Sequence, residues 1–306
     1  DLTGAGDIRL GGTLNGANSL VVNTAGVTRL VGVVGGVTPL SSLTTDAPGM
    51  VVITASGVRT SGAQTYNDGV TVGASTTLTS TTDTLSFVRI TGTNALFDLH
   101  LDSATRLALA DIDVAGNLHV TTHSSRNAAV TPVVVAGVWQ KPGTSLSIGG
   151  TSTFTADTGT NQDADLSSTT NRFVGRLSFD EVGTGSWRDV GVTTTVSLDL
   201  APLTSGGSVN LQTQGAQLHT DTITTTHDLT VNTLGGAASL GATTVAGDLV
   251  LSTKTGVVDA QGHDVGGGAV TQRALRRKLL RAGSEPESPF ADLTNAYTPS
   301  FGLMGH

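Results

Sequence analysis

The stretch LALADIDVAGNLHVTT, residues 107–122, indicates the fold. Apolar residues alternate with polar ones on both sides of an Ala-Gly-Asn corner. Because successive side chains of a strand point to opposite faces, Leu118 and Val120 are expected to share one face. His119 and Thr121 are then expected to share the other. The stretch therefore predicts two short, half-buried strands joined by a turn of small residues.

The same pattern recurs along the chain, and in the C-terminal third it recurs at a fixed spacing of about 20 residues, as in a repeat protein. The segments at this spacing are SGGSVNLQ (205–212), TTHDLTVN (225–232) and VAGDLVLS (245–252). Elsewhere in the chain, VAGNLHVT at 114–121 fits the same template. IGGTSTFT at 148–155 fits less well, since Phe154 is its one apolar residue of the expected pair. The residues predicted to form the repeat core are Leu118, Val120, Val209, Leu211, Leu229, Val231, Leu249 and Leu251.

A second short strand is predicted before each corner, for example at 196–200, 216–220 and 237–241. One unit is then strand, corner, strand, corner, which is too short to bury its apolar face alone. Stacked copies would bury a continuous column. We therefore predict an all-β fold, a parallel β-helix or β-solenoid, over residues 1–270. Units of about 20 residues give about 13 rungs, and the strand spacing gives a rod on the order of 65 Å long.

The composition fits such a rod and excludes several other classes. The chain has 40 glycines, 4% aromatic and 13% charged residues, and small β-branched residues favour strands. A net charge of −8 argues against binding to nucleic acid, which needs basic clusters. The sequence has no cysteine, so disulfides and thiolate metal sites are excluded. It has no apolar run of about 18 residues, the length of a membrane-spanning helix.

Two interruptions of the pattern are predicted to be wider rungs or loops that project from the rod. Residues 123–145 contain two prolines and a tryptophan. Residues 157–190 begin with a polar, loop-like run and then gather Phe173, Phe179 and Trp187. If the protein binds a ligand through its side, these two stretches are the predicted receptor surface.

The C-terminal residues 271–306 differ from the rod. RALRRKLLRAG at 273–283 predicts a short basic amphipathic helix, and an extended tail with three prolines follows it. Residues 1–272 carry a net charge of −10, from 11 basic and 21 acidic side chains. The tail is predicted either to cap its own rod or to dock on the rod of the next copy, which would build a filament. The predicted contact residues are Arg273, Arg276, Arg277, Lys278, Arg281, Tyr297, Phe301 and Leu303.

Several segments resemble the repeats of large bacterial surface proteins of the filamentous-haemagglutinin type. These segments are LALADIDVAGNLHVTT, IGGTSTFTADTGT, NRFVGRLSF and SGAQTYNDGVTVGASTTLTS, and the resemblance covers roughly residues 55–260. Members of that family are secreted adhesins, frequently exported by two-partner systems, and their repeats form right-handed parallel β-helices. The resemblance implies a right-handed solenoid at the cell surface or outside the cell. Because the chain begins at Asp1 directly in a strand-like stretch, we expect it to be a piece of a longer precursor.

The sequence predicts no catalytic, cofactor or metal site. The candidate carboxylate pairs are Asp111 with Asp113, Asp98 with Asp102, and Asp163 with Asp165 in a loop, and we interpret all six as surface residues. His119 and His123 lack the helical spacing of a metal motif, and NQDAD at 161–165 lacks the glycine and glutamate of an EF-hand loop. We therefore expect a non-enzymatic fibre or adhesin segment whose partners are its own copies and host-cell or matrix glycans. The alternatives are a ligand-binding adhesin module and a β-helical polysaccharide lyase or hydrolase.

Overall fold

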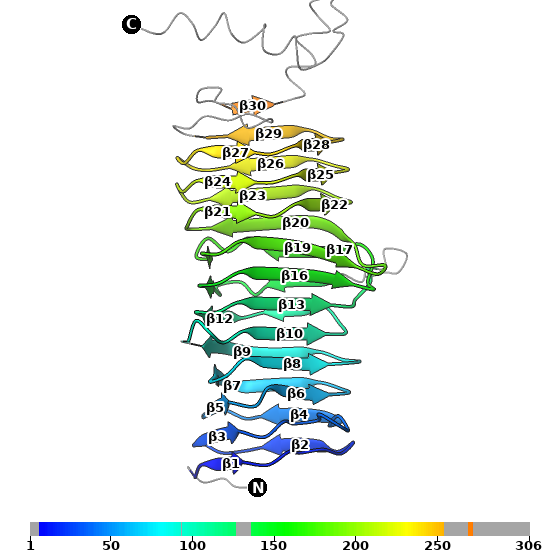
Figure 1. Ribbon diagram of the computed structural model, residues 1–306, viewed down its shortest axis with the longest axis vertical. Coiled ribbons are helices and arrows are strands. Elements are labelled where there is room, and N and C mark those ends of the chain that lie inside the picture. The colour runs from blue at the N-terminus through cyan, green and yellow to red at the C-terminus, as the bar shows by residue number, and fades with distance from the viewer. Residues whose placement is uncertain (1–5, 93, 127–135, 254–268, 272–306) are drawn as a thin grey trace, which may run out of the picture.

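The computed structural model describes residues 6–92, 94–126, 136–253 and 269–271. These residues form an all-β solenoid of about 11 turns that contains no helix (Figure 1). β1 lies at one end of the long axis and β29 near the other. The sequence-based number of rungs was too high because the central turns are longer than the regular repeat. Asn117 and Thr151, which are hydrogen-bonded across one turn, are 34 residues apart.

The strands stack into three long sheets and one short sheet. The first contains β1 (Ile8–Leu10), β3 (Val27–Leu30), β5 (Met50–Ile53), β7 (Gln64–Val72), β9 (Leu85–Gly92), β12 (Asp111–Val114), β15 (Leu146–Ile148) and β18 (Arg172–Phe173), with β2 (Ser19–Val22) and β4 (Ser42–Thr45) joined through β7. The second contains β6 (Gly57–Thr60), β8 (Thr76–Ser80), β10 (Leu99–Ser103), β13 (Leu118–Thr122), β16 (Ser152–Asp157), β19 (Leu177–Val182), β21 (Leu198–Leu200), β24 (Leu218–Thr220) and β27 (Ala238–Leu240).

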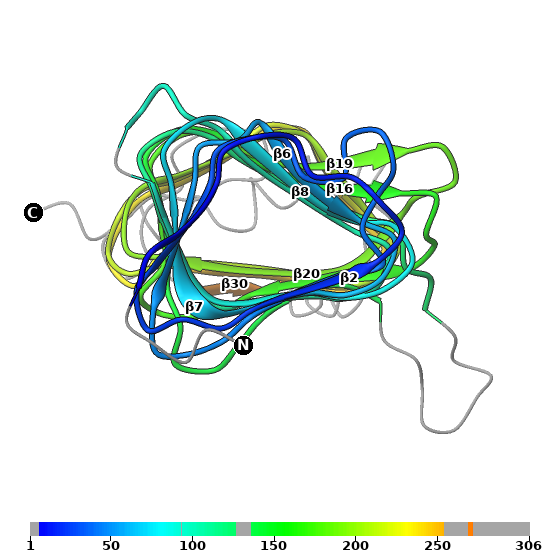
Figure 2. The ribbon, with the colours of Figure 1, turned by 90° about the horizontal axis from the view of Figure 1, so that it is seen from below.

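The third sheet contains β11 (Leu107–Leu109), β14 (Gly137–Gln140), β17 (Gln162–Leu166), β20 (Trp187–Thr194), β23 (Val209–Thr213), β26 (Leu229–Asn232), β29 (Leu249–Ser252) and β30 (Ala269–Thr271). The short sheet contains β22 (Leu203–Ser205), β25 (Ile223–Thr225) and β28 (Thr243–Val245). Among the described strands, every ladder is parallel except the one between β29 and β30. Seen along the axis, successive turns superpose around a common interior (Figure 2).

The alternation of the sequence directs the apolar side chains into that interior. On β13, Leu118 and Val120 are fully buried, whereas His119 and Thr121 are partly exposed. The eight residues predicted to form the repeat core are all 0–8% exposed. They belong to one hydrophobic cluster that extends from Leu30 to Leu251. Burial of this column, shared by neighbouring turns, supplies most of the favourable free energy of folding.

The regular turns contain a third strand that the sequence analysis missed. The predicted strands at 196–200, 216–220 and 237–241 are confirmed as β21, β24 and β27. Between β21 and β23, however, β22 forms another short side of the coil and buries Leu203. The pattern was hard to recognise because the second inward residue of β22 is Ser205, which is also fully buried. A hydroxyl therefore takes a core position where the search required an apolar side chain.

Buried hydroxyls occur at other corners and satisfy backbone carbonyls there. Ser80 Oγ donates to the carbonyl of Gly62 at 2.9 Å, and Thr213 Oγ1 donates to that of Ala216 at 2.6 Å. Ser80 and Thr213 are both fully buried. A corner carbonyl that points away from the sheet ladders would otherwise lose its hydrogen bond to water on burial. The Thr- and Ser-rich composition thus contributes to the interior as well as to the surface.

Much of residues 157–190 forms rungs of the solenoid. β17, β18 and β19 lie within this stretch and pair in the ladder, as does the start of β20. Phe173 and Trp187 are buried in the core, at 0% and 1% exposure. The ring of Phe179 stacks on that of Phe154 at 5.5 Å and meets Trp187 edge-on at 5.6 Å. Of the two alternatives, the wider rung therefore describes most of this stretch.

The predicted basic helix and tail at 272–306 lie outside the described residues, and so do the eight predicted contact residues from Arg273 to Leu303. Residues 127–135 of the first interruption also lie outside them. The strand β14 follows in that interruption and carries Trp139. In the described part of the chain, no helix has the length and apolar character needed to cross a membrane.

Asp68 is a buried carboxylate, and its negative charge lowers the stability of the fold. It is 2% exposed, and its Oδ1 has no hydrogen-bond partner among the described residues. Burial first, and the charge of Asp46 second, raise the pKa of Asp68, while the side chain of Thr45 opposes this shift. A raised pKa in the folded state means that ionised Asp68 destabilises the fold at pH values above its unfolded pKa.

We expect Asp68→Asn to increase the free energy of unfolding at pH 7 by about 1 kcal/mol, on the scale of one unpaired buried polar atom. The gain should shrink as the pH falls toward the unfolded pKa of about 3.9, because Asp68 is then protonated in both states. Urea unfolding at several pH values measures this. Asp113→Asn, on the exposed side of β12, is the control. An equal gain at acidic and neutral pH would contradict the assignment.

Candidate functional site

The richest group of charged and aromatic side chains on the described surface lies on the outer face of the third sheet. We call it the Trp139 surface and define it by Arg106, Trp139, Asp163, Asp165 and Arg188. It is built by the parallel ladder: Trp139 of β14 pairs with Asp165 of β17, and Gly137 pairs with Asp163. Both aspartates were predicted to lie in a loop, which is wrong, because β17 spans residues 162–166.

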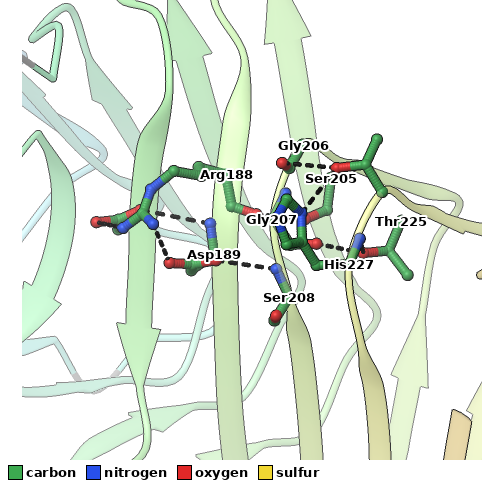
Figure 3. A network of polar contacts seen from close by, with 10 residues as sticks. Arg188, Asp189, Ser205, Gly206, Gly207, Ser208, Thr225 and His227 are labelled. Atoms are coloured by element: carbon green, nitrogen blue, oxygen red, sulfur yellow. Dashed lines mark hydrogen bonds and ion pairs between the residues drawn. The ribbon is translucent and has the colours of Figure 1, made fainter. Parts of the chain in front are cut away.

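Arg188 connects two carboxylates of this surface. Its Nη2 lies 2.6 Å from Asp163 Oδ2, and its Nη1 lies 2.5 Å from Asp189 Oδ2 (Figure 3). The hydrogen bond with Asp163 raises the pKa of Arg188. The side chains of Arg188 and Asp163 are only 26% and 16% exposed, so solvent screens this pair less than an open surface pair.

Trp139 presents its ring on the same face. The guanidinium carbon of Arg106 lies 4.9 Å from the ring centroid, within the range of a cation–π contact. Burial lowers the pKa of Arg106, while the charges of Asp163 and Asp165 oppose this shift. The ring of Trp139 is partly exposed, in contrast to the 1% exposure of Trp187. A tryptophan at a surface offers both a large apolar ring and an N–H donor to a contacting molecule.

Next to the Trp139 surface, polar side chains of one turn bind backbone groups of the next. Asp189 Oδ1 accepts a hydrogen bond from the backbone N–H of Ser208 at 2.9 Å (Figure 3). Ser205 Oγ donates to the carbonyl of Arg188 and accepts from the N–H of Gly207. The equivalent Thr225 donates to the carbonyl of Gly207. These contacts stabilise the corner, which makes this network structural.

Three of the candidate carboxylates, Asp111, Asp163 and Asp165, are held by contacts to neighbouring groups of the solenoid. Asp163 Oδ2 binds Arg188 and its Oδ1 accepts from the N–H of Asp189. Asp165 Oδ1 accepts from the hydroxyl of Ser167 at 2.5 Å, and Asp111 Oδ1 accepts from the N–H of Ser145 at 2.8 Å. General acid–base catalysis of glycoside hydrolysis needs a carboxylic acid and a carboxylate that face one substrate. The described contacts of these aspartates fit structural roles better.

The histidines are arranged differently from the sequence interpretation. His123 Nε2 lies 2.9 Å from Asp102 Oδ1, and His123 Nδ1 lies 3.8 Å from Asp157 Oδ2. His119 contacts His100, one turn away, rather than His123. The sequence analysis did not single out His100, because the two histidines become neighbours only once the length of the intervening turn is known. Within the part of the chain that the structure describes, Asp98, His100 and His119 are the group placed to hold a metal ion.

The fold and surface together define the chain as a parallel β-solenoid with one charged, aromatic side face. No protein-family model, curated protein or solved structure matches the chain.

Proposed function

We propose that this chain is the rod of an extracellular, non-enzymatic fibre or adhesin on a bacterial surface, of the filamentous-haemagglutinin type. The observation that supports this proposal is the single hydrophobic core from Leu30 to Leu251. Parallel strand ladders surround this core in the described turns. Hydrogen bonds directed along the axis resist bending and stretching, as a mechanical spacer requires. We further propose that the coil is right-handed, the preferred sense of parallel crossovers.

The unpaired edges of the first described strands support the proposed head-to-tail assembly. At the N-terminal end, β1 pairs only with β3 and β2 only with β4 among the described strands. An edge of a parallel sheet that no described strand covers is a template for strand addition. We propose that a basic helix and tail at 272–306 of one copy binds the acidic rod of the next. This contact is heterologous and propagates as a filament.

Electron microscopy of the full chain and of a variant lacking residues 272–306 tests the assembly. We expect end-to-end fibres from the full chain and short single rods from the truncated one. A second variant keeps the tail at full length but changes its basic residues to Gln, namely Arg273, Arg276, Arg277, Lys278 and Arg281. It distinguishes the effect of the charges on assembly from the effect of losing the segment. Fibres that persist without the tail would refute its role. A full chain that is monomeric at every concentration would refute the assembly.

A second function, ligand binding through the side of the rod, is favoured by Trp139 and Arg106. A partly exposed tryptophan held by an arginine, with Asp165 as its ladder partner, suits an uncharged or basic sugar. We expect Trp139→Ala to reduce binding to glycans on an array at least about tenfold, as loss of a stacking platform does. Arg172→Ala, on the exposed side of β18 in the first sheet, is the control. Reducing-sugar release from acidic glycans would instead support the enzymatic alternative.

A further inference from the structure

Two histidines stack on the outer face of the second sheet. β10 and β13 pair in register, which places His100 directly opposite His119. Their imidazole rings lie 4.3 Å apart between centroids, with planes only 11° apart. The residues next in the ladder on either side are Thr77 and Thr153. The stack is therefore a single pair confined to two turns.

A carboxylate completes the cluster. Asp98 precedes β10, and the ligand atoms of Asp98, His100 and His119 all lie within 4.8 Å of one another. Asn117 holds Asp98 in place, since its Nδ2 and its backbone N–H donate to Asp98 Oδ1 at 2.9 and 3.3 Å. Because both bonds end on Oδ1, Oδ2 remains available as a ligand. Asn117 is itself fixed by Thr151, whose N–H donates to Asn117 Oδ1 at 2.8 Å.

The ligand atoms of this cluster suit a metal cation. Neutral imidazole is the form that binds metals. One divalent ion between the edges of the two imidazoles would attract the lone pairs of both rings and the carboxylate of Asp98. All three ligand residues are partly exposed, which gives an ion access from solvent.

The geometry points to a site for one divalent transition-metal ion, of the zinc class, held by Asp98, His100 and His119 with water as a further ligand. Two imidazoles and a carboxylate are a ligand set typical of Zn²⁺ and of Cu²⁺ or Ni²⁺, not of Ca²⁺ or Mg²⁺. Bonds of about 2.0–2.2 Å place two ligands of a tetrahedral zinc ion about 3.4 Å apart. The two stacked rings would have to turn so that a nitrogen of each points at the ion, which would bring the ligand atoms to this separation. The site is independent of the proposed fibre function.

Zinc chloride titration of the full chain against a competing chromophoric chelator tests the site. We expect one Zn²⁺ per chain at this site, with a raised melting temperature at saturating zinc. His100→Asn, His119→Asn and Asp98→Asn are each expected to weaken affinity by at least about tenfold. Co²⁺ provides a second readout, because visible absorption bands of a four-coordinate ion should appear with the full chain and disappear with His119→Asn.

Two control variants make the outcome specific. His219→Asn changes an exposed histidine on β24 of the same sheet, and His123→Asn removes the partner of Asp102 and Asp157. Both are expected to leave the affinity within about twofold, below the loss from removing a ligand. Far-ultraviolet circular dichroism checks that every variant is folded. Absence of binding at about 100 µM Zn²⁺, or a His100→Asn/His119→Asn double variant with unchanged affinity, would overturn the assignment. Loss of binding in His123→Asn but not in His119→Asn would overturn it too.

Discussion

Val120→Lys is expected to unfold the rod or to lower its free energy of unfolding by about 4 kcal/mol or more, because it forces an unpaired charge into a packed core. Val120 is 1% exposed and lies between Leu101 and Phe154 in the ladder of the second sheet. Adjacent turns bury this position on both sides, so the lysine side chain has no short path to water along the strand.

The adjacent substitution Thr121→Lys provides a matched control. Thr121 points to the outer face of the same strand and pairs with Asp102 on the neighbouring turn. The same lysine there should change the free energy of unfolding by no more than about 0.5 kcal/mol, as is usual for surface positions. Urea unfolding followed by circular dichroism measures both variants. Equal effects at the two positions would contradict the assigned inward and outward faces.

Asn171→Ala is expected to cost about 3–5 kcal/mol, because it leaves several buried polar groups without partners. The side chain of Asn171 is fully buried. Its Oδ1 accepts from Gln140 Nε2 at 2.8 Å and from the N–H of Leu146 at 2.9 Å. Its Nδ2 donates to Gln140 Oε1 at 2.8 Å and to the carbonyl of Leu166 at 3.0 Å.

A double-mutant cycle with Gln140→Ala tests this buried amide pair. The two side chains satisfy each other, so the double variant should cost at least about 1 kcal/mol less than the sum of the single variants. Asn210→Ala, on the exposed side of β23, should change the free energy of unfolding by less than about 0.5 kcal/mol. Strict additivity of the Gln140 and Asn171 substitutions would show that the pair is not coupled.

The sequence predicted the parts of the fold in which apolar and polar residues alternate at a constant repeat spacing. In residues 205–252 the repeat is regular, so the strands and their inward residues could be located from alternation and spacing. The strands on the third side of each regular turn, such as β22 and β25, were not predicted, because Ser205 and Thr225 occupy interior positions there. For the wide central turns the sequence left rung and loop as alternatives, because Gln140 and Asn171 are polar and yet buried, and such residues normally indicate a loop.

The sites were less predictable than the fold because they depend on pairing across turns. Asp163 and Arg188, or His100 and His119, meet only through the register of stacked strands. That register depends on the length of each intervening corner, and corner lengths vary through the central turns. Periodicity identified which side of a strand faces outward, but not which outward residues become neighbours.

The regular turns from β21 to β29 also have an evolutionary consequence. Equivalent strands there follow at a constant interval, and each pairs only with the turn immediately before and after it. In-frame duplication or loss of one turn would join surfaces that already match. The length of the rod could therefore change in steps of about 4.8 Å while every contact between turns is kept. Recombination between near-identical segments of the gene would then be enough to produce longer and shorter variants within a population.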